Sequence, residues 1–305
     1  MKKYLKYSPL VKEALDNNKP VVALESTIIT HGMEYPQNYE TAISVEEVIK
    51  NKGAIPATIA IIDGIINIGL TNEQIFEISK NKQSYEKCTT RDLSYIISKK
   101  KNGSTTVAAT MFCAELANIK VFVTGGIGGV HYGNDWDVSA DLTELSRTQI
   151  CVVCAGPKAI LDINRTIEVL ETYSVPVVGY QTDYLPEFYF SKGDFKLKIR
   201  ADEHKEIADI FKVQIDLNIK SGMLVTIPVP EEHSADKQLV KEGINKAIKK
   251  AEELNIRGHL ITPFLLKEVN EITKGKSSDA NIALIKNNAI NGALISVELN
   301  KLINN

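Results

Sequence analysis

The sequence has few cysteines and no excess of positive charge, and each shortage excludes a class of protein. Four cysteines in 305 residues are too few for a disulfide framework, which fits a reducing compartment. The 36 lysines and arginines are balanced by 38 aspartates and glutamates, so the formal charge of -2 provides no field that attracts a nucleic-acid polymer or an anionic membrane. Any anionic ligand must therefore be held by a local pocket.

Long apolar runs are also absent. None approaches the roughly 20 residues that a membrane span requires, and the N-terminal segment lacks the apolar stretch and cleavage site of a secretory signal. We therefore expect a cytoplasmic protein without a membrane partner. The chain is 44% hydrophobic and contains no repeat, low-complexity tract or linker, so we expect residues 1–305 to form a single domain.

Short β-branched runs alternate with segments of helical period, which predicts an α/β fold with a largely parallel sheet. We expect strands at residues 20–24, 57–62, 120–124, 149–154, 175–179 and 223–228. Ser104 as an N-cap predicts a helix through Leu116, and Pro157 in a first turn predicts a helix over 158–172. Three more helices, at 235–254, 263–273 and 279–302, would cap the sheet.

Lys158 is the first candidate for chemistry, because ligands of parallel sheets bind beyond the carboxyl ends of the strands. It follows a predicted strand and would stand in the first turn of the next helix. The helix dipole and partial burial would both favour its neutral amine. Such an amine can attack a carbonyl or anomeric carbon and form an iminium. The same position also suits a solvent-facing lysine at the start of an amphipathic helix.

Glu25 is the second candidate, because it directly follows an apolar strand. A carboxylate pointing into the crevice from there would have a raised pKa and could act as a general acid. A loop cap or salt bridge is the alternative interpretation. Nearby His31 could carry a proton or only form a hydrogen bond within its loop.

Two segments could bind an anion. The run Thr124-Gly-Gly-Ile-Gly-Gly-Val-His131 lets the backbone approach a ligand and offers N–H donors, but it matches neither a P-loop nor the dinucleotide fingerprint. The segment 103–109 offers hydroxyls and N–H groups at a predicted helix start, which suit a phosphate, and Lys87 could supply the balancing charge. A capped helix beside a charged loop is the alternative.

Asp137 and Asp141 lie four residues apart and would share a face of a helical turn. Two carboxylates without histidine or cysteine suggest a hard cation such as magnesium or manganese, held mostly by water. One of them could instead be a helix N-cap. Cys151 and Cys154 have CxxC spacing, but residues three apart in a strand point to opposite faces, so we interpret both as core.

Together these motifs closely resemble the pseudouridine-5'-phosphate glycosidase family, over about residues 8 to 302. The resemblance implies a three-layer α/β/α enzyme that reversibly cleaves the C–C glycosidic bond of pseudouridine 5'-phosphate, giving uracil and ribose 5-phosphate. It also implies a homotrimer with one divalent metal, Mn²⁺, per subunit. The segments that carry the resemblance are Ala23-Leu-Glu-Ser-Thr27, Thr30-His-Gly-Met33, Lys87-Cys-Thr-Thr-Arg-Asp92, Thr105-Thr-Val-Ala-Ala-Thr-Met111, Gly125-Gly-Ile-Gly-Gly-Val-His131, Asp137-Val-Ser-Ala-Asp-Leu142 and Ala155-Gly-Pro-Lys158.

The resemblance further implies a role for individual residues. Lys158 matches the family's covalent nucleophile, Glu25 its proton donor, and Asp137 a metal ligand whose cation keeps mainly a water shell. His131 lies in a matching loop but receives no role. The positions that match substrate contacts are Lys87, Thr106, Val107, Ser139, Ala140, Asp141 and Asn281.

A lysine suits this reaction, because a C–C glycosidic bond has no basic leaving atom for a pair of glycosidase carboxylates to protonate. We hypothesise that Glu25 protonates the ribose ring oxygen while Lys158 attacks C1'. Uracil then leaves, and water hydrolyses the iminium. Two other functions remain open. A Schiff-base aldolase acting on a sugar phosphate would use the same lysine, and a phosphate-ligand sensor would bind without turnover.

Overall fold

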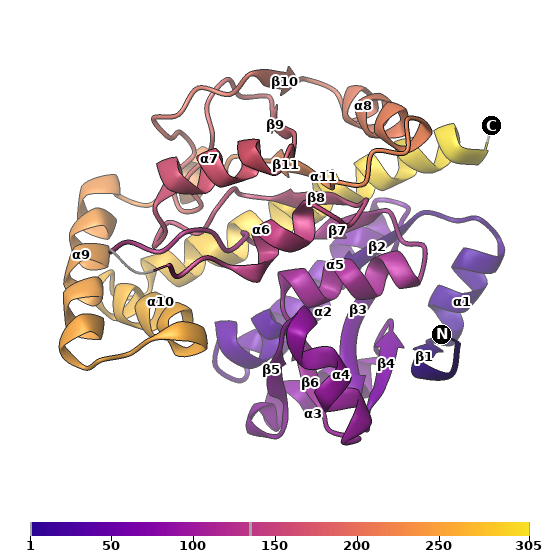
Figure 1. Cartoon of the computed structure of the whole chain (residues 1–305), viewed down its shortest axis with the longest axis horizontal. Helices are drawn as coiled ribbons and strands as arrows, with labels where there is room; N and C mark the ends of the chain where they lie inside the picture. Colours follow the sequence, from indigo (N-terminus) through magenta and orange to yellow (C-terminus); the bar gives the residue numbers. More distant parts are fainter. Residues whose placement is uncertain (1, 134–135, 305) are drawn as a thin grey trace.

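The computed structural model describes residues 2–133 and 136–304, in which no helix is long and apolar enough to cross a membrane. The described part contains an eleven-stranded sheet in the order β1-β4-β3-β2-β7-β8-β11-β9-β10, with β6 pairing β3 and β5 pairing β6 (Figure 1). The strands are β1 Leu5–Tyr7, β2 Val21–Leu24, β3 Ile55–Ile62, β4 Ile65–Ile68, β5 Glu86–Cys88, β6 Gly103–Thr105, β7 Val121–Val123, β8 Cys151–Cys154, β9 Val177–Tyr180, β10 Ile199–Ala201 and β11 Met223–Thr226.

The sheet is parallel at every pairing except β3–β4 and β3–β6. Parallel neighbours require crossover connections, and helices supply them. The helices are α1 Pro9–Asp16, α2 Gln37–Asn51, α3 Asn72–Lys80, α4 Leu93–Ser98, α5 Val107–Leu116, α6 Ala140–Leu145, α7 Ile163–Thr172, α8 His204–Asp216, α9 Lys237–Glu253, α10 Ile261–Ile272 and α11 Lys276–Asn304. A π-helical turn, η2 (Ile28–Gly32), follows β2.

Successive strand residues point to opposite faces of the sheet, so their side chains pack into two hydrophobic cores, one on each face. In β2, Val22 belongs to the core shared with α2, α8, α9, α10 and α11, whereas Ala23 belongs to the core shared with α1, α4, α5, α6 and α7. Cys151 and Cys154 divide in the same way, and both are fully buried, which confirms their interpretation as core residues. The predicted three-layer α/β/α architecture is therefore confirmed.

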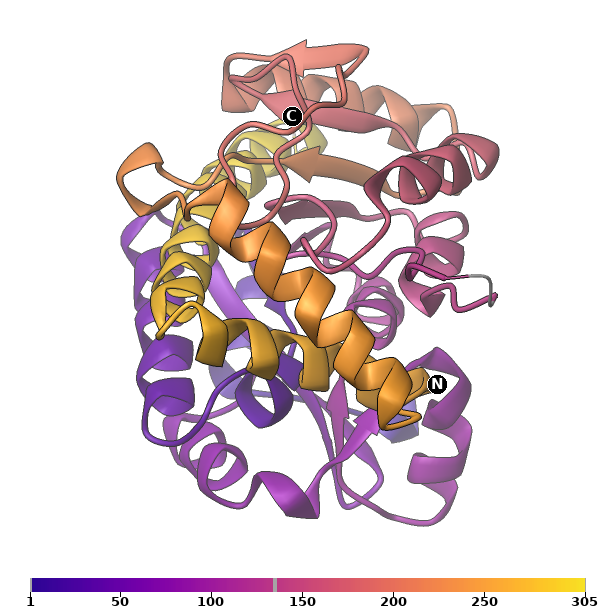
Figure 2. The same cartoon turned by 90° about the vertical axis from the view of Figure 1, so that its left-hand side faces the viewer.

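Helix α11 forms the central part of the predicted helical cap. It runs behind the strands in Figure 1, and a Cβ on its Gly292 would lie 2.2 Å from Cγ2 of Val123 in β7. The absence of a side chain there lets the helix backbone approach the strand closely. Helices α9 and α10 form a hairpin at one side of the molecule, which faces the viewer in Figure 2.

Two predicted helix starts are wrong. The helix expected over 158–172 begins only at Ile163, where Asp162 is the N-cap and accepts a hydrogen bond from Arg165 N at 3.1 Å. Ser104 lies in β6, because this segment pairs with β3 and β5, and Thr106 caps α5 instead. Local capping signals were present in both cases, but tertiary strand pairing and a second capping residue decided the boundaries.

Candidate active site

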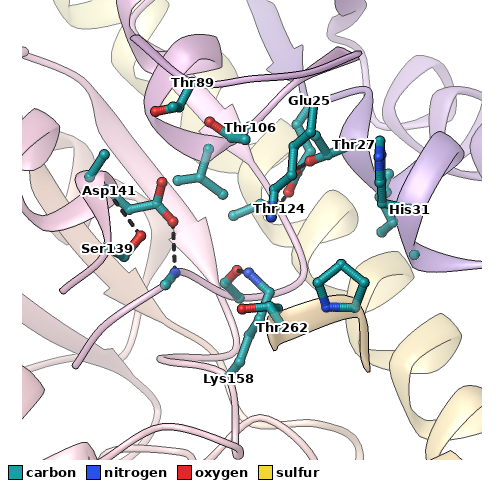
Figure 3. Close-up of a pocket in the computed structure, with 18 of the residues that line it drawn as sticks. Glu25, Thr27, His31, Thr89, Thr106, Thr124, Ser139, Asp141, Lys158 and Thr262 are labelled. Carbon is teal, nitrogen blue, oxygen red and sulfur yellow. Dashed lines mark hydrogen bonds between the residues drawn. The ribbon is translucent and has the colours of Figure 1, made fainter. Parts of the chain in front are cut away.

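The carboxyl ends of β2, β7 and β8 meet at a cavity of about 590 Å³. Glu25 follows β2, Thr124 follows β7, and Lys158 follows β8 by four residues. Their side chains gather around one space in Figure 3, with Asp141 and Ser139 across from Thr124 and His31. The cavity thus lies where parallel strands of an α/β fold are expected to form a ligand site.

Both carboxylate oxygens of Glu25 accept hydrogen bonds. Thr124 Oγ1 donates a hydrogen bond to Oε1 at 2.5 Å, and Thr27 Oγ1 donates to Oε2. Burial raises the pKa of Glu25, while the charge of Lys158 and the two hydroxyl donors oppose that rise. A carboxyl group with a raised pKa keeps its proton to higher pH, which is what a general acid requires. The sequence signal was Glu25 itself; the two threonine partners were missed.

Lys158 lies in the loop before α7, so the argument from a helix first turn does not apply. Its Nζ donates a hydrogen bond to the carbonyl of Gly126 at 2.7 Å, and its backbone N–H donates to Ile127 O at 3.0 Å. A Cβ at Gly126 would lie 2.6 Å from Phe188 and 2.8 Å from the Gly156 carbonyl. Position 126, whose carbonyl accepts the hydrogen bond from Lys158, has no room for a side chain, so glycine is required there.

One end of the cavity is basic. Lys87 from β5 lies there with Thr106 and Val107 at the start of α5. Burial lowers the pKa of Lys87, and the charge of Lys158 lowers it further, whereas Asp141 and Glu25 oppose the shift. Thr106 Oγ1 accepts a hydrogen bond from Ala109 N at 3.4 Å and keeps its own O–H to donate. A cation, a hydroxyl and a helix start suit an anionic group.

The Ser139, Ala140 and Asp141 segment begins α6 on the adjacent wall. The carboxylate of Asp141 accepts from Ala108 N at 2.9 Å and from Gly128 N at 2.7 Å, and Asp141 N donates to Ser139 Oγ at 3.2 Å. Asp141 and Asp137 do not share a helical face, because Asp137 precedes α6. That expectation from their spacing is wrong.

Helices α11 and α10 also contribute residues to the lining of the cavity. Asn281 of α11 has a buried Oδ1 without a hydrogen-bond partner in the part of the chain that the structure describes. Such an oxygen is costly unless a ligand or water donates to it. Thr262, Pro263 and Leu266 of α10 line the cavity as well. Sequence reasoning missed the α10 residues, since nothing in a helical period indicates contact with a site.

Asp137 lines the cavity beside His131, whose backbone N–H donates to Asp137 O at 3.0 Å. Burial lowers the pKa of His131, and the charge of Asp137 opposes this. Across residues 2–133 and 136–304, no group of three histidine, cysteine, aspartate or glutamate side chains could enclose a metal ion. A hard cation held by the carboxylate of Asp137 alone would therefore complete its coordination shell with water.

His31, from η2, also lines the cavity. Its Nδ1 lies 2.6 Å from Thr30 Oγ1. The neighbouring hydroxyl agrees with the interpretation of a histidine bonded within its own loop, and a proton-carrying role stays a prediction.

Comparison with known proteins gives consistent matches. The profile of the family "Indigoidine synthase A like protein" matches residues 10–298. A "Pseudouridine-5'-phosphate glycosidase" of Clostridium botulinum is 53% identical over 304 residues, 99% of each chain. The crystal structure of an indigoidine synthase A-like protein from Thermotoga maritima aligns with a TM-score of 0.89 at 33% identity, covering 97% of this chain and 96% of that one. The prealnumycin C-glycosynthase AlnA in complex with ribulose 5-phosphate aligns with a TM-score of 0.91 at 34% identity over 99% of both chains.

Proposed function

Since this chain belongs to the indigoidine synthase A-like family of pseudouridine-5'-phosphate glycosidases, we propose that its cavity cleaves pseudouridine 5'-phosphate to uracil and ribose 5-phosphate. The observation that carries the proposal is the pairing of a buried acid with an amine. Glu25 and Lys158 come from different strand ends and line the same cavity, close enough for the lysine charge to act on the Glu25 carboxyl. Ordinary glycosidases pair two carboxylates instead.

In the proposed mechanism, protonated Glu25 donates its proton to the ribose ring oxygen while the amine of Lys158 attacks C1' and the C1'–O bond breaks. The resulting amine loses a proton, and its lone pair forms the C1'=N bond as the C1'–C5 bond to uracil breaks. Uracil C5 takes up a proton. One water then hydrolyses the iminium, which restores the Lys158 amine and yields ribose 5-phosphate.

Substrate positioning is proposed from the polar residues that line the cavity. The proposed phosphate contacts are at the basic end, namely Lys87, Thr106 and Val107, together with Ser139 and Ala140 at the start of α6. The buried Asn281 Oδ1 is proposed as an acceptor for a uracil N–H. Holding both ends of the nucleotide would place C1' between Glu25 and Lys158, and such orientation lowers the barrier by several kcal/mol, up to about 7–11 kcal/mol.

We further propose that Asp137 binds one Mn²⁺ per subunit through a single carboxylate oxygen and a water shell. The cation would add positive charge near the nucleotide. The donor set supports a hard divalent ion, because the described residues that line the cavity with Asp137 include no cysteine or methionine. Family resemblance supports a homotrimer, and the four buried free thiols suit a reducing cytoplasm. Sedimentation of the purified protein measures its oligomeric state.

Uracil release tests the function directly. The protein is mixed with Mn²⁺ and pseudouridine 5'-phosphate, and the change in ultraviolet absorbance is followed, with a chelator as control. We expect turnover by the natural chain and none by Lys158→Ala. Full activity of K158A would refute the mechanism. Reduction with borohydride in the presence of ribose 5-phosphate should attach the sugar to Lys158. An adduct without uracil release would favour the aldolase, and binding without either would favour a sensor.

A further inference from the structure

Asp141 is an unexpected residue at the basic end of the cavity. Its side chain is 7% exposed, and a buried carboxylate beside a phosphate site would repel the substrate unless other groups engaged its charge. Both oxygens are in fact engaged by backbone donors, Ala108 N of α5 and Gly128 N. The protein backbone thus holds the side chain in place, and each carboxylate oxygen keeps a further lone pair.

Gly128, whose N–H donates a hydrogen bond to Asp141, belongs to the same loop as the hydrogen-bond partner of Lys158. Gly128 belongs to the glycine loop, residues 125–129, and stands two residues after Gly126, whose carbonyl accepts the hydrogen bond from Lys158 Nζ. The loop is also fixed by Ile127 N, which donates to Gly156 O at 3.2 Å. Figure 3 shows the Asp141 carboxylate and Lys158 on two sides of the same loop.

The space around Gly128 shows how closely the loop is held. A Cβ there would lie 2.2 Å from Ser139 Oγ and 2.8 Å from Asp141 Oδ2. Two side chains at the start of α6 therefore press against the loop, and one of them also bonds to it. Displacing Asp141 would remove its link between the loop and α5, whereas Ser139 N would still donate to Gly129 O at 2.9 Å.

We propose that Asp141 is a positioning residue: its carboxylate clamps the glycine loop to the start of α5 and so sets where Lys158 rests beside C1' of the substrate. This inference rests on the proposed function, which names Lys158 as the nucleophile. It gives Asp141 a role that acts through the loop, whereas the neighbouring Lys87 and Thr106 face the substrate themselves.

The charge of Asp141 provides a readout that a purely structural role would not move. Glu25 faces Lys158, whose charge lowers its pKa, and Asp141, whose charge raises it, together with the hydroxyls of Thr27 and Thr124. A neutral residue at position 141 would remove a charge that raises the pKa of Glu25. Glu25 would then lose its proton at lower pH, and activity that depends on the acid would fall at lower pH.

The test compares two variants by uracil release and by borohydride trapping of ribose 5-phosphate on Lys158. Asp141→Asn cannot accept from both N–H groups and removes the charge, so we expect slower trapping, by tenfold or more up to the roughly 10²-fold that a misplacement of about 1 Å costs. The alkaline fall of activity should also move to lower pH. Gly128→Ala displaces the loop with the charge intact, so trapping should slow without the pH shift. Asp236→Asn, which changes the exposed N-cap of α9, is the matched control.

Unchanged trapping in D141N overturns the proposal, and so does a pH shift without slower trapping, because that result leaves only a charge effect. If D141N does not fold, G128A decides: trapping at the natural rate overturns the clamp, and slow trapping with an unshifted pH profile supports it. Failure of the natural chain to release uracil would instead overturn the proposed function, and it is measured separately.

Discussion

The hydrogen bond from Thr124 to Glu25 gives the most specific prediction. Thr124→Val keeps the shape of a 3% exposed side chain but removes the hydroxyl that donates to Glu25 Oε1 at 2.5 Å. That hydrogen bond favours the charged carboxylate and lowers the Glu25 pKa. Its loss must therefore raise the pKa, and the general acid must keep its proton to higher pH.

The size of the shift follows from the strength of the bond. A hydrogen bond to a charged group contributes about 1.5–3 kcal/mol, and about 1.36 kcal/mol corresponds to one pKa unit. Because Thr27 still donates to the other oxygen, we expect the alkaline fall of the activity profile to move upward by about one to two pH units. The proton donor is retained, so activity on the plateau should change by less than about tenfold.

The assay is uracil release as a function of pH, under single-turnover conditions so that product release does not mask the chemical step. Thr226→Val is the control, because Thr226 is a buried threonine at the end of β11 whose hydroxyl donates to Val178 O at 3.2 Å, outside the residues that line the cavity. Its profile should match that of the natural chain. A T124V profile that is unmoved, or moved to lower pH, would refute Glu25 as the acid.

Other predictions concern stability and the metal. Phe122→Ala, in a fully buried position of β7, should lower the free energy of unfolding in urea by about 3–5 kcal/mol. Gly126→Ala should cost about 1–3 kcal/mol by the same measurement, because its Cβ would meet Phe188, and should also slow the trapping of Lys158. Burial raises the pKa of Glu46, so its ionised form destabilises the fold as pH rises; Glu46→Gln should melt at a higher temperature near neutral pH, and the difference should vanish toward about pH 4. Asp137→Ala should raise the Mn²⁺ concentration needed for half-maximal uracil release, and an unchanged titration would contradict the proposed metal ligand.

Much of the fold is determined by local pattern. All six predicted strands are present within a few residues, as are the three C-terminal helices, because β-branched runs and apolar residues of helical period depend on neighbouring residues. The short strands β1, β4, β5, β6 and β10 were not predicted. Four of them, Leu-Lys-Tyr, Glu-Lys-Cys, Gly-Ser-Thr and Ile-Arg-Ala, lack the continuous apolar run that marked the predicted strands of the same length, and all five exist here through their pairing in the sheet.

The helix start at 158 shows the limit of local signals. Pro157 suits a first helical turn, but the segment after it instead bonds to the glycine loop through Ile127 and Gly126, and α7 begins after Asp162. The prediction for Lys158 as a cavity residue did not depend on that helix. It followed from the place of Lys158 after a strand, which the parallel sheet brings to the same edge as Glu25.

The sequence by itself determined the alternation of strands and helices, the lack of an apolar run long enough to span a membrane, and the side chains capable of chemistry. Only the tertiary structure decided their partners. Thr124 reaches Glu25 across 99 residues of chain, Asp141 reaches Ala108 across 33, and α10 lines the cavity from the distant C-terminal part. Hydrogen bonds between residues so far apart form when packed layers bring their atoms within about 3 Å, and local propensity contains no record of that packing.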